Sequence, residues 1–172
     1  MNAFRSRRDD GAATVEFALV VPLLLGLAFG IINFGIIFAS QISLNSAARD
    51  AARAGVVQPL SGTGLTCAQI AVQVRTNATT IALDPSKVAV TVTAPTPTTG
   101  TAKSCTLPAG AQNLTNEVTG TGASKALCSG SRVLTNPQLT VSLSYAYNSP
   151  VPLVPPYSLN QTAVGKFQCE YA

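Results

Sequence analysis

The chain has 172 residues, which is enough for one ordinary domain and a membrane anchor. Only 10% of the residues are charged, the formal net charge is +4, and there is no histidine. The low charge suits a chain that lies partly in lipid, and the absence of histidine removes the commonest general base and metal ligand. The cations form no basic stripe along a helix, so the sequence does not predict nucleic-acid binding.

The first predicted element is a membrane span at residues 17–39, a run of 23 residues without a charge. A transmembrane helix needs about 20 apolar residues to cross ~30 Å of hydrocarbon, and a soluble core helix is rarely apolar on every side for that length. Basic segments beside a span stay in the cytoplasm. Arg5, Arg7 and Arg8 therefore predict a cytoplasmic N-terminus, with the rest of the chain outside.

The helix is expected to continue outward to about Val57. Residues 41–57 carry apolar side chains at helical spacing, and the apolar run before them is longer than the core of a secretory signal. A helix over residues 12–57 would be about 70 Å long at 1.5 Å per residue. Only half of that fits in a bilayer, so the outer half must pack on a folded domain.

An acidic residue, Glu16, stands at the start of this apolar segment. A carboxylate costs about 2.5–3.5 kcal/mol at the centre of a span and little at headgroup level, where it can snorkel. Gly11 lies five residues before Glu16 and ends a short basic leader. A hydrophilic leader, a glycine and an apolar helix with glutamate as its fifth residue resemble a prepilin processing site.

The resemblance extends beyond this short motif. The segment 11–17, with Pro22 after it and the Ala-Ala-Arg repeat at residues 47–53, closely resembles the TadE-like family of minor pseudopilins. That family belongs to the tight-adherence (Flp, type IVb) pilus system. The similarity is dense over residues 10–57, and the ending at residues 163–171 also resembles the family's last strand.

The resemblance implies specific roles for residues near the N-terminus. A prepilin peptidase would cut between Gly11 and Ala12, where the glycine lets a protease approach the backbone closely. Glu16 would pair with the new α-amino group of Ala12 in another subunit, and Phe17 would pack beside that pair. Pro22 is expected to kink the helix. A mature chain that begins with alanine differs from major type IV pilins, which usually begin with phenylalanine.

The rest of the chain predicts a small α+β domain outside the membrane. Its first two strands alternate apolar and polar residues, and its one further helix has Thr66 as a plausible N-cap. The predicted elements are a helix at 66–83, strands at 88–93, 139–147 and 158–170, a flexible loop at 94–137 and a proline-rich turn at 150–156. We therefore expect an antiparallel sheet covered by the outer half of the long helix, as in pilins.

Four cysteines follow the span: Cys67, Cys105, Cys128 and Cys169. Outside the cytoplasm an even set of cysteines most often forms disulfides, and four cysteines allow three pairings. We favour Cys105–Cys128, which would close the long loop, and Cys67–Cys169, which would tie the second helix to the last strand. The spacing contains no C-x2-C motif, and no metal or cofactor is expected.

No catalytic set is visible in the sequence. The serines and threonines have no histidine beside them, and the exported acids are widely separated: Asp50, Asp84, Glu117 and Glu170. A serine paired with a lysine stays open, the available lysines being Lys87, Lys103, Lys125 and Lys166. We expect a protein without enzymatic activity.

The predicted organisation is a cytoplasmic leader at 1–11, a long helix at 12–57 and an extracytoplasmic domain at 58–172. The leading hypothesis is a minor pseudopilin of the inner membrane that helps to assemble Flp-type pili. Its partners would be the lipid bilayer, a prepilin peptidase, other pilins or pseudopilins and the inner-membrane assembly platform. The alternatives are a single-pass surface protein or adhesin that keeps its leader, and a membrane-anchored envelope enzyme.

Overall fold

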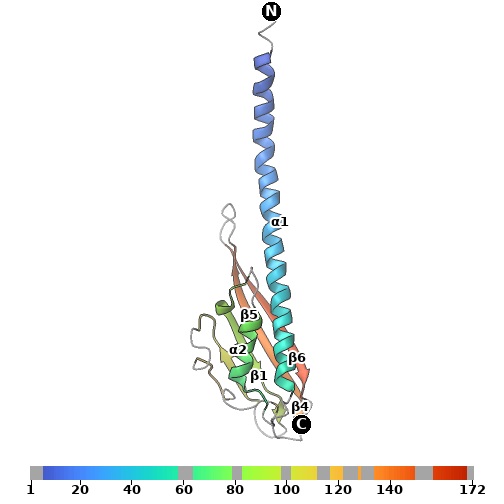
Figure 1. Ribbon diagram of the computed structural model, residues 1–172, viewed down its shortest axis with the longest axis vertical. Coiled ribbons are helices and arrows are strands. Elements are labelled where there is room, and N and C mark those ends of the chain that lie inside the picture. Colours follow the sequence, from blue (N-terminus) through green and yellow to red (C-terminus); the bar gives the residue numbers. More distant parts are fainter. Residues whose placement is uncertain are drawn as a thin grey trace, which may run out of the picture.

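The computed structural model describes residues 6–57, 64–78, 83–97, 102–111, 117–121, 128, 134–149 and 157–169. The predicted α+β class is confirmed: a long apolar helix is followed by a shorter one and an antiparallel sheet (Figure 1). The helices are α1 (Ser6–Val56), α2 (Cys67–Asn77) and the 3-10 helix η1 (Pro85–Lys87). The strands are β1 (Val88–Thr93), β2 (Thr96–Pro97), β3 (Ser104–Leu107), β4 (Leu134–Asn136), β5 (Gln138–Asn148) and β6 (Ser158–Gln168).

The main sheet has the strand order β3-β1-β5-β6, and every neighbouring pair is antiparallel. The hairpin β5–β6 is its longest part, running from Gln138 opposite Gln168 to Asn148 opposite Ser158. Strands β2 and β4 form a separate two-stranded sheet. The strands predicted at 88–93, 139–147 and 158–170 correspond to β1, β5 and β6, with Glu170 outside the described residues.

One face of the main sheet carries both helices. Helix α1 packs against β5 and β6, and α2 packs against β1, β3 and α1 (Figure 1). Along β1 and β5 the side chains on this face are buried and alternate with more exposed side chains on the other face, a period of two. The largest buried side chains are Leu44, Ile70, Leu107, Leu139, Leu143, Val74, Val88, Val90, Val92 and Val141.

The alanines of the Ala-Ala-Arg repeat bring α1 unusually close to the sheet. Ala47, Ala48, Ala51 and Ala52 are at most 2% exposed, whereas the arginines of the repeat are exposed. Opposite them on β6 stands Gly165, where an added Cβ would overlap the backbone carbonyl of Ala48. Small side chains on both elements therefore set the distance between helix and sheet.

Helix α2 begins as predicted and ends early. The Thr66 hydroxyl accepts a hydrogen bond from the Gln69 amide (3.3 Å), and the Gln69 side chain accepts one from the Thr66 amide (2.9 Å). These two bonds form a capping box. The helix ends at Asn77 with Ala78 as its C-cap, six residues before the predicted end at Leu83.

Buried Arg75 ties α2 to the sheet. Its guanidinium donates to the carbonyls of Val88 (2.9 Å), Ala111 (2.8 Å) and Pro108. Burial lowers the pKa of Arg75, and the charges of Glu117 and Asp84 oppose that shift. Carbonyl dipoles thus satisfy a cation that has little contact with water.

The expected flexible loop at 94–137 contains regular structure. Strand β3 pairs with β1 along an edge of the main sheet, and β2 pairs with β4. Thr119 also exchanges backbone hydrogen bonds with Thr106 (2.8 and 3.0 Å). The prediction missed β3 because only four residues form it, too few for a clear alternating pattern. The proline-rich turn predicted at 150–156 lies outside the described residues.

The predicted disulfide pairing, Cys105–Cys128 with Cys67–Cys169, is wrong. The structure joins Cys67 to Cys105 and Cys128 to Cys169, with Cα–Cα distances of 6.3 and 5.7 Å. Cys105 lies on β3, and its buried side chain is bonded at the first residue of α2. The expected pairing treated Cys105 as a loop residue, whereas strand pairing places it beneath α2.

Candidate functional site on helix α1

The N-terminal half of α1 extends beyond the sheet (Figure 1). From Gly11 to Ile32 its side chains are exposed, with Val21, Phe29 and Gly30 partly covered. The most apolar 18-residue window of the helix has a mean hydropathy of 2.4, and none of it is buried. These 22 residues span about 33 Å at 1.5 Å per residue, close to the ~30 Å thickness of bilayer hydrocarbon. The helix is therefore long and apolar enough to cross a membrane once.

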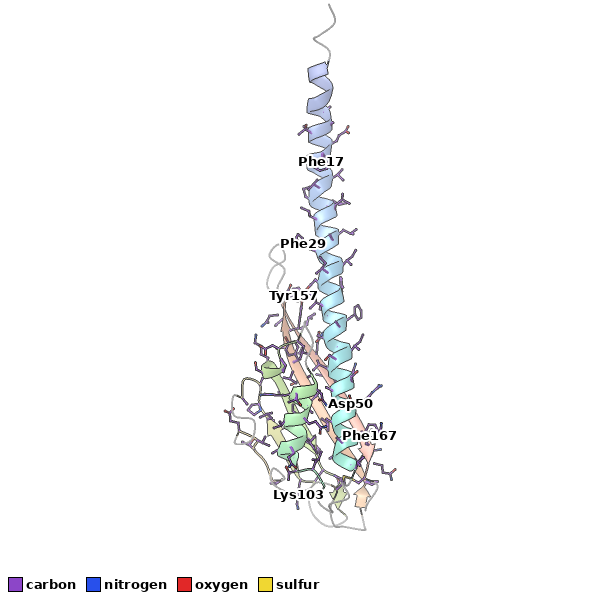
Figure 2. The ribbon with its side chains drawn as sticks, viewed as in Figure 1. Phe17, Phe29, Asp50, Lys103, Tyr157 and Phe167 are labelled. Atoms are coloured by element: carbon purple, nitrogen blue, oxygen red, sulfur yellow. A yellow bond between two sulfur atoms is a disulfide. The ribbon has the colours of Figure 1, made fainter. Side chains whose placement is uncertain are left out.

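The residues that the sequence singles out for processing and assembly lie on this exposed half. Ala12, Glu16 and Phe17 are exposed, and nothing lies within 4 Å of a Cβ built at Gly11. Ala12 and Glu16 are four residues apart and share one face of the helix. In Figure 2, Phe17 lies far from the sheet. The folded domain therefore does not cover the predicted processing segment.

Pro22 lies inside α1, and the helix continues through it from Ser6 to Val56. Proline has no backbone N–H, so the carbonyl of Ala18 lacks its usual intrahelical donor. The expected kink therefore does not end the helix or divide it into two elements.

Asn33 is the first described residue of α1 that the domain buries, and it lies within the run predicted to be in lipid. Asn33 is 7% exposed, and its side-chain oxygen accepts a hydrogen bond from the Tyr147 hydroxyl (2.8 Å). Its amide nitrogen donates to the hydroxyl of Tyr157. Burial raises the pKa of Tyr147, and the neighbouring Tyr157 and Tyr145 add to that shift. In the sequence, Asn33 is one polar residue within an apolar run, and no local pattern indicates this role.

A second set of polar contacts lies two turns further along α1. The Ser40 hydroxyl donates to the side-chain oxygen of Gln161 on β6 (2.8 Å). The side-chain nitrogen of Gln161 donates to the backbone carbonyl of Ile37 (2.9 Å), and the side-chain nitrogen of Gln41 donates to the backbone carbonyl of Thr162 (2.9 Å). The two sets fix α1 against the hairpin β5–β6 between Asn33 and Gln41.

The opposite side of the same stretch is apolar and uncovered. Phe34, Phe38 and Ile42 are 63%, 65% and 65% exposed and follow one another at intervals of four residues. Residues at this spacing share a helix face. An apolar stripe thus continues from the exposed half of α1 along the outside of the domain, where the domain itself provides no partner within the described residues.

The described part of the chain brings no group of three potential metal ligands together. Of the four lysines considered for a serine–lysine pair, Lys87 forms an ion pair with Asp84 (3.6 Å), and Lys125 lies outside the described residues. Lys103 and Lys166 are exposed. The residues that the structure assembles into a site are therefore those of α1 and of the hairpin that binds it.

The fold and this helix define an α+β protein with one long N-terminal helix of membrane-spanning character. Residues 11–53 of the chain match the family model described as TadE-like protein. No curated protein and no solved structure matches the chain. The match covers the exposed half of α1 and the alanine repeat, so the resemblance to the TadE-like family is confirmed over that segment. It supports a single-pass membrane protein associated with the tight-adherence pilus.

Proposed function

We propose that this chain is a minor pseudopilin of the tight-adherence pilus, cut after Gly11 and active in pilus assembly without being an enzyme. The observation that carries the proposal is the position of Gly11 and Glu16. Both lie on an apolar helix that the domain leaves uncovered, within the segment that matches the TadE-like family. The proposed partners are a prepilin peptidase, other pilins or pseudopilins and the inner-membrane assembly platform.

The exposure of Gly11 supports cleavage between Gly11 and Ala12. A protease must draw the backbone out of the helix, and glycine makes the helix about 1 kcal/mol less stable than alanine would at that position. An exposed site with no packed neighbours adds no tertiary cost to that local unfolding. Cleavage would also remove the basic leader that holds the cytoplasmic end of the span.

Glu16 supports assembly through α1. It is the one charged residue between Gly11 and Arg49, and an acid in hydrocarbon favours a paired state. The α-amino group of a neighbour's Ala12 would provide that charge after cleavage. Two charges ~4 Å apart attract by about 4 kcal/mol at an effective dielectric constant near 20, and desolvation offsets much of this. The pair would set the register between subunits more than it would add stability.

The stripe formed by Phe34, Phe38 and Ile42 supports lateral packing in the same assembly. Each side chain leaves more than 60% of its surface open, on the helix face that the domain does not use. Burying one such side chain is worth about 1.5–3 kcal/mol. A parallel apolar helix from another subunit would cover the stripe and the span together.

The disulfides support export of the domain to the outside of the inner membrane. All four cysteines are joined in two disulfides, and disulfides persist in oxidising compartments such as the periplasm. Together with the basic leader, they support a cytoplasmic N-terminus and a domain outside the membrane.

Mass spectrometry of the membrane-extracted chain tests the proposal. In cells that contain the peptidase, we expect a chain that begins at Ala12. The Gly11→Val variant should keep residues 1–11 and fail to support pili, whereas the control Gly26→Val, at another open helix position, should be cut normally. An intact leader on the wild-type chain would contradict the proposal. If such chains still reached the surface, that result would favour the alternative of an unprocessed surface protein.

A further inference from the structure

The end of the hairpin β5–β6 lies beside α1 at the level of Asn33. Tyr147 and Tyr157, which flank this end, both bind the Asn33 side chain. Figure 2 shows Tyr157 at the end of the sheet nearest the exposed half of α1. The two strand ends therefore lie level with Asn33 along the helix axis, and we call their described residues, 147–149 and 157–160, the hairpin tip.

Most exposed side chains of the hairpin tip are polar. Asn148, Ser158 and Asn160 are exposed there, Ser149 is partly exposed, and Leu159 is the one large apolar side chain exposed, at 42%. Polar side chains and strand ends in hydrocarbon are costly unless the protein satisfies them. The hydrocarbon must therefore end on the N-terminal side of Asn33, although the apolar run of the sequence continues to Ala39.

The helix beyond this limit has the length that a bilayer needs. The 22 residues from Gly11 to Ile32 span about 33 Å, against ~30 Å of hydrocarbon. Beside them, Tyr157 of the hairpin tip is partly exposed and lies where aromatic residues gather at a membrane surface. A span at 17–39 would instead submerge Asn33 and the strand ends by about 10 Å.

We propose that the hairpin tip rests in the outer headgroup layer of the membrane and fixes the span at residues 11–32. The inner edge of the hydrocarbon then falls about 20 residues before Ile32, near Ala13. Glu16 lies roughly 4–5 Å inside that edge, whereas a span at 17–39 would leave it outside the hydrocarbon. This inference rests on the single membrane span of the proposed function and needs neither cleavage nor pilus assembly.

Single cysteines along α1 test the span. All four natural cysteines are in disulfides, so each engineered cysteine is the one free thiol of the full chain. The purified variants Leu24→Cys, Phe38→Cys and Ile42→Cys are placed at low density in vesicles of phosphatidylethanolamine and phosphatidylglycerol. A membrane-impermeant maleimide is added to the vesicles. A protease added outside the vesicles measures the fraction of chains whose domain faces outward, and the labelling is compared for those chains.

We expect Phe38→Cys to react about as fast as Ile42→Cys, because both positions are 65% exposed and lie outside the hydrocarbon. Leu24→Cys should react at least tenfold more slowly. If Leu24→Cys and Phe38→Cys both reacted slowly with the maleimide, the span at residues 11–32 would be wrong, but a single membrane span would still hold. Reaction of Leu24→Cys at the rate of Ile42→Cys would instead overturn the span itself, and with it the membrane part of the proposed function.

Fluorescence quenching tests the contact of the hairpin tip with the headgroups. A fluorophore is attached to Ser158→Cys at the tip, or to Lys103→Cys at the opposite end of the domain (Figure 2). A nitroxide on the lipid headgroup should quench the first by at least twofold and leave the second unchanged. Equal quenching at both positions, or none at Ser158→Cys, would contradict the proposed contact between the hairpin tip and the lipid headgroups.

Discussion

The close contact between Gly165 and Ala48 predicts that a larger residue at position 165 will destabilise the domain. The Gly165→Ala variant adds one methyl group where it would overlap a backbone carbonyl. A carbonyl in a helix cannot rotate away, so α1 and β6 must separate along the alanine face. Extra atoms in a well-packed core cost about 1–3 kcal/mol. Replacing a strand glycine by alanine otherwise stabilises the fold by about 0.5–1 kcal/mol, so we expect a net loss of about 1 kcal/mol in the free energy of unfolding.

Urea unfolding of the full chain in detergent measures this loss. Tyrosine emission reports on the domain, since Tyr145 and Tyr147 are buried in it. With a urea dependence of about 2 kcal/mol per molar, this loss lowers the unfolding midpoint by about 0.5 M. The matched control is Lys166→Ala, which changes the next residue of β6, whose side chain is exposed.

The free energy of unfolding of Lys166→Ala should stay within about 0.5 kcal/mol of the wild-type value. If Gly165→Ala unfolded at the same urea concentration as Lys166→Ala, the close approach of helix and sheet would not limit stability. The physical account of the alanine repeat would then fail. A larger residue, as in Gly165→Val, should lower the midpoint further, because it adds more volume at the same carbonyl.

Two further predictions concern the disulfides and Tyr147. Peptide mapping without reduction should recover Cys67 joined to Cys105, and a peptide that joins Cys105 to Cys128 would contradict the fold. The Cys67→Ser, Cys105→Ser double variant should lose up to about 4 kcal/mol of unfolding free energy, because this disulfide has a sequence separation of 38. Because burial raises the pKa of Tyr147, its stabilising effect is complete below the unfolded pKa of about 10 and is lost as the pH rises through the folded value. Tyr147→Phe should flatten this alkaline loss in a pH series of urea midpoints, and an unchanged slope would exclude Tyr147 as its source.

Local patterns in the sequence were enough to predict the long helix, the start of α2 and the three longer strands. The capping box at Thr66 and the alternation along β5 each depend on residues that are close in the chain. Such features are favourable before any tertiary contact forms, so the sequence reports them directly. Gly11 and Glu16, the residues proposed for processing and assembly, also form a short local pattern.

Features that depend on distant residues were not predictable in the same way. Strand β3 is short and becomes regular through its pairing with β1, and that pairing places Cys105 beneath α2. In the sequence, Asn33 is only a single polar residue in an apolar run. In the folded chain, the hairpin β5–β6 brings two tyrosine hydroxyls to its side chain. In both cases the deciding partner lies far away in the sequence, so local propensity carries no signal of it.

The structure divides α1 by the environment of each side chain rather than by hydropathy. An apolar run alone places the span at 17–39, whereas the polar hairpin tip ends the hydrocarbon before Asn33 and leaves Phe38 and Ile42 outside it. This shift has opposite consequences at the two ends of the span. It moves Glu16 into the hydrocarbon, where a charged partner would stabilise it, and it moves an apolar stripe into water, where an apolar partner would. A neighbouring helix with a free N-terminal amine and an apolar flank would meet both needs, which links the register of the span to assembly of α1 with another subunit.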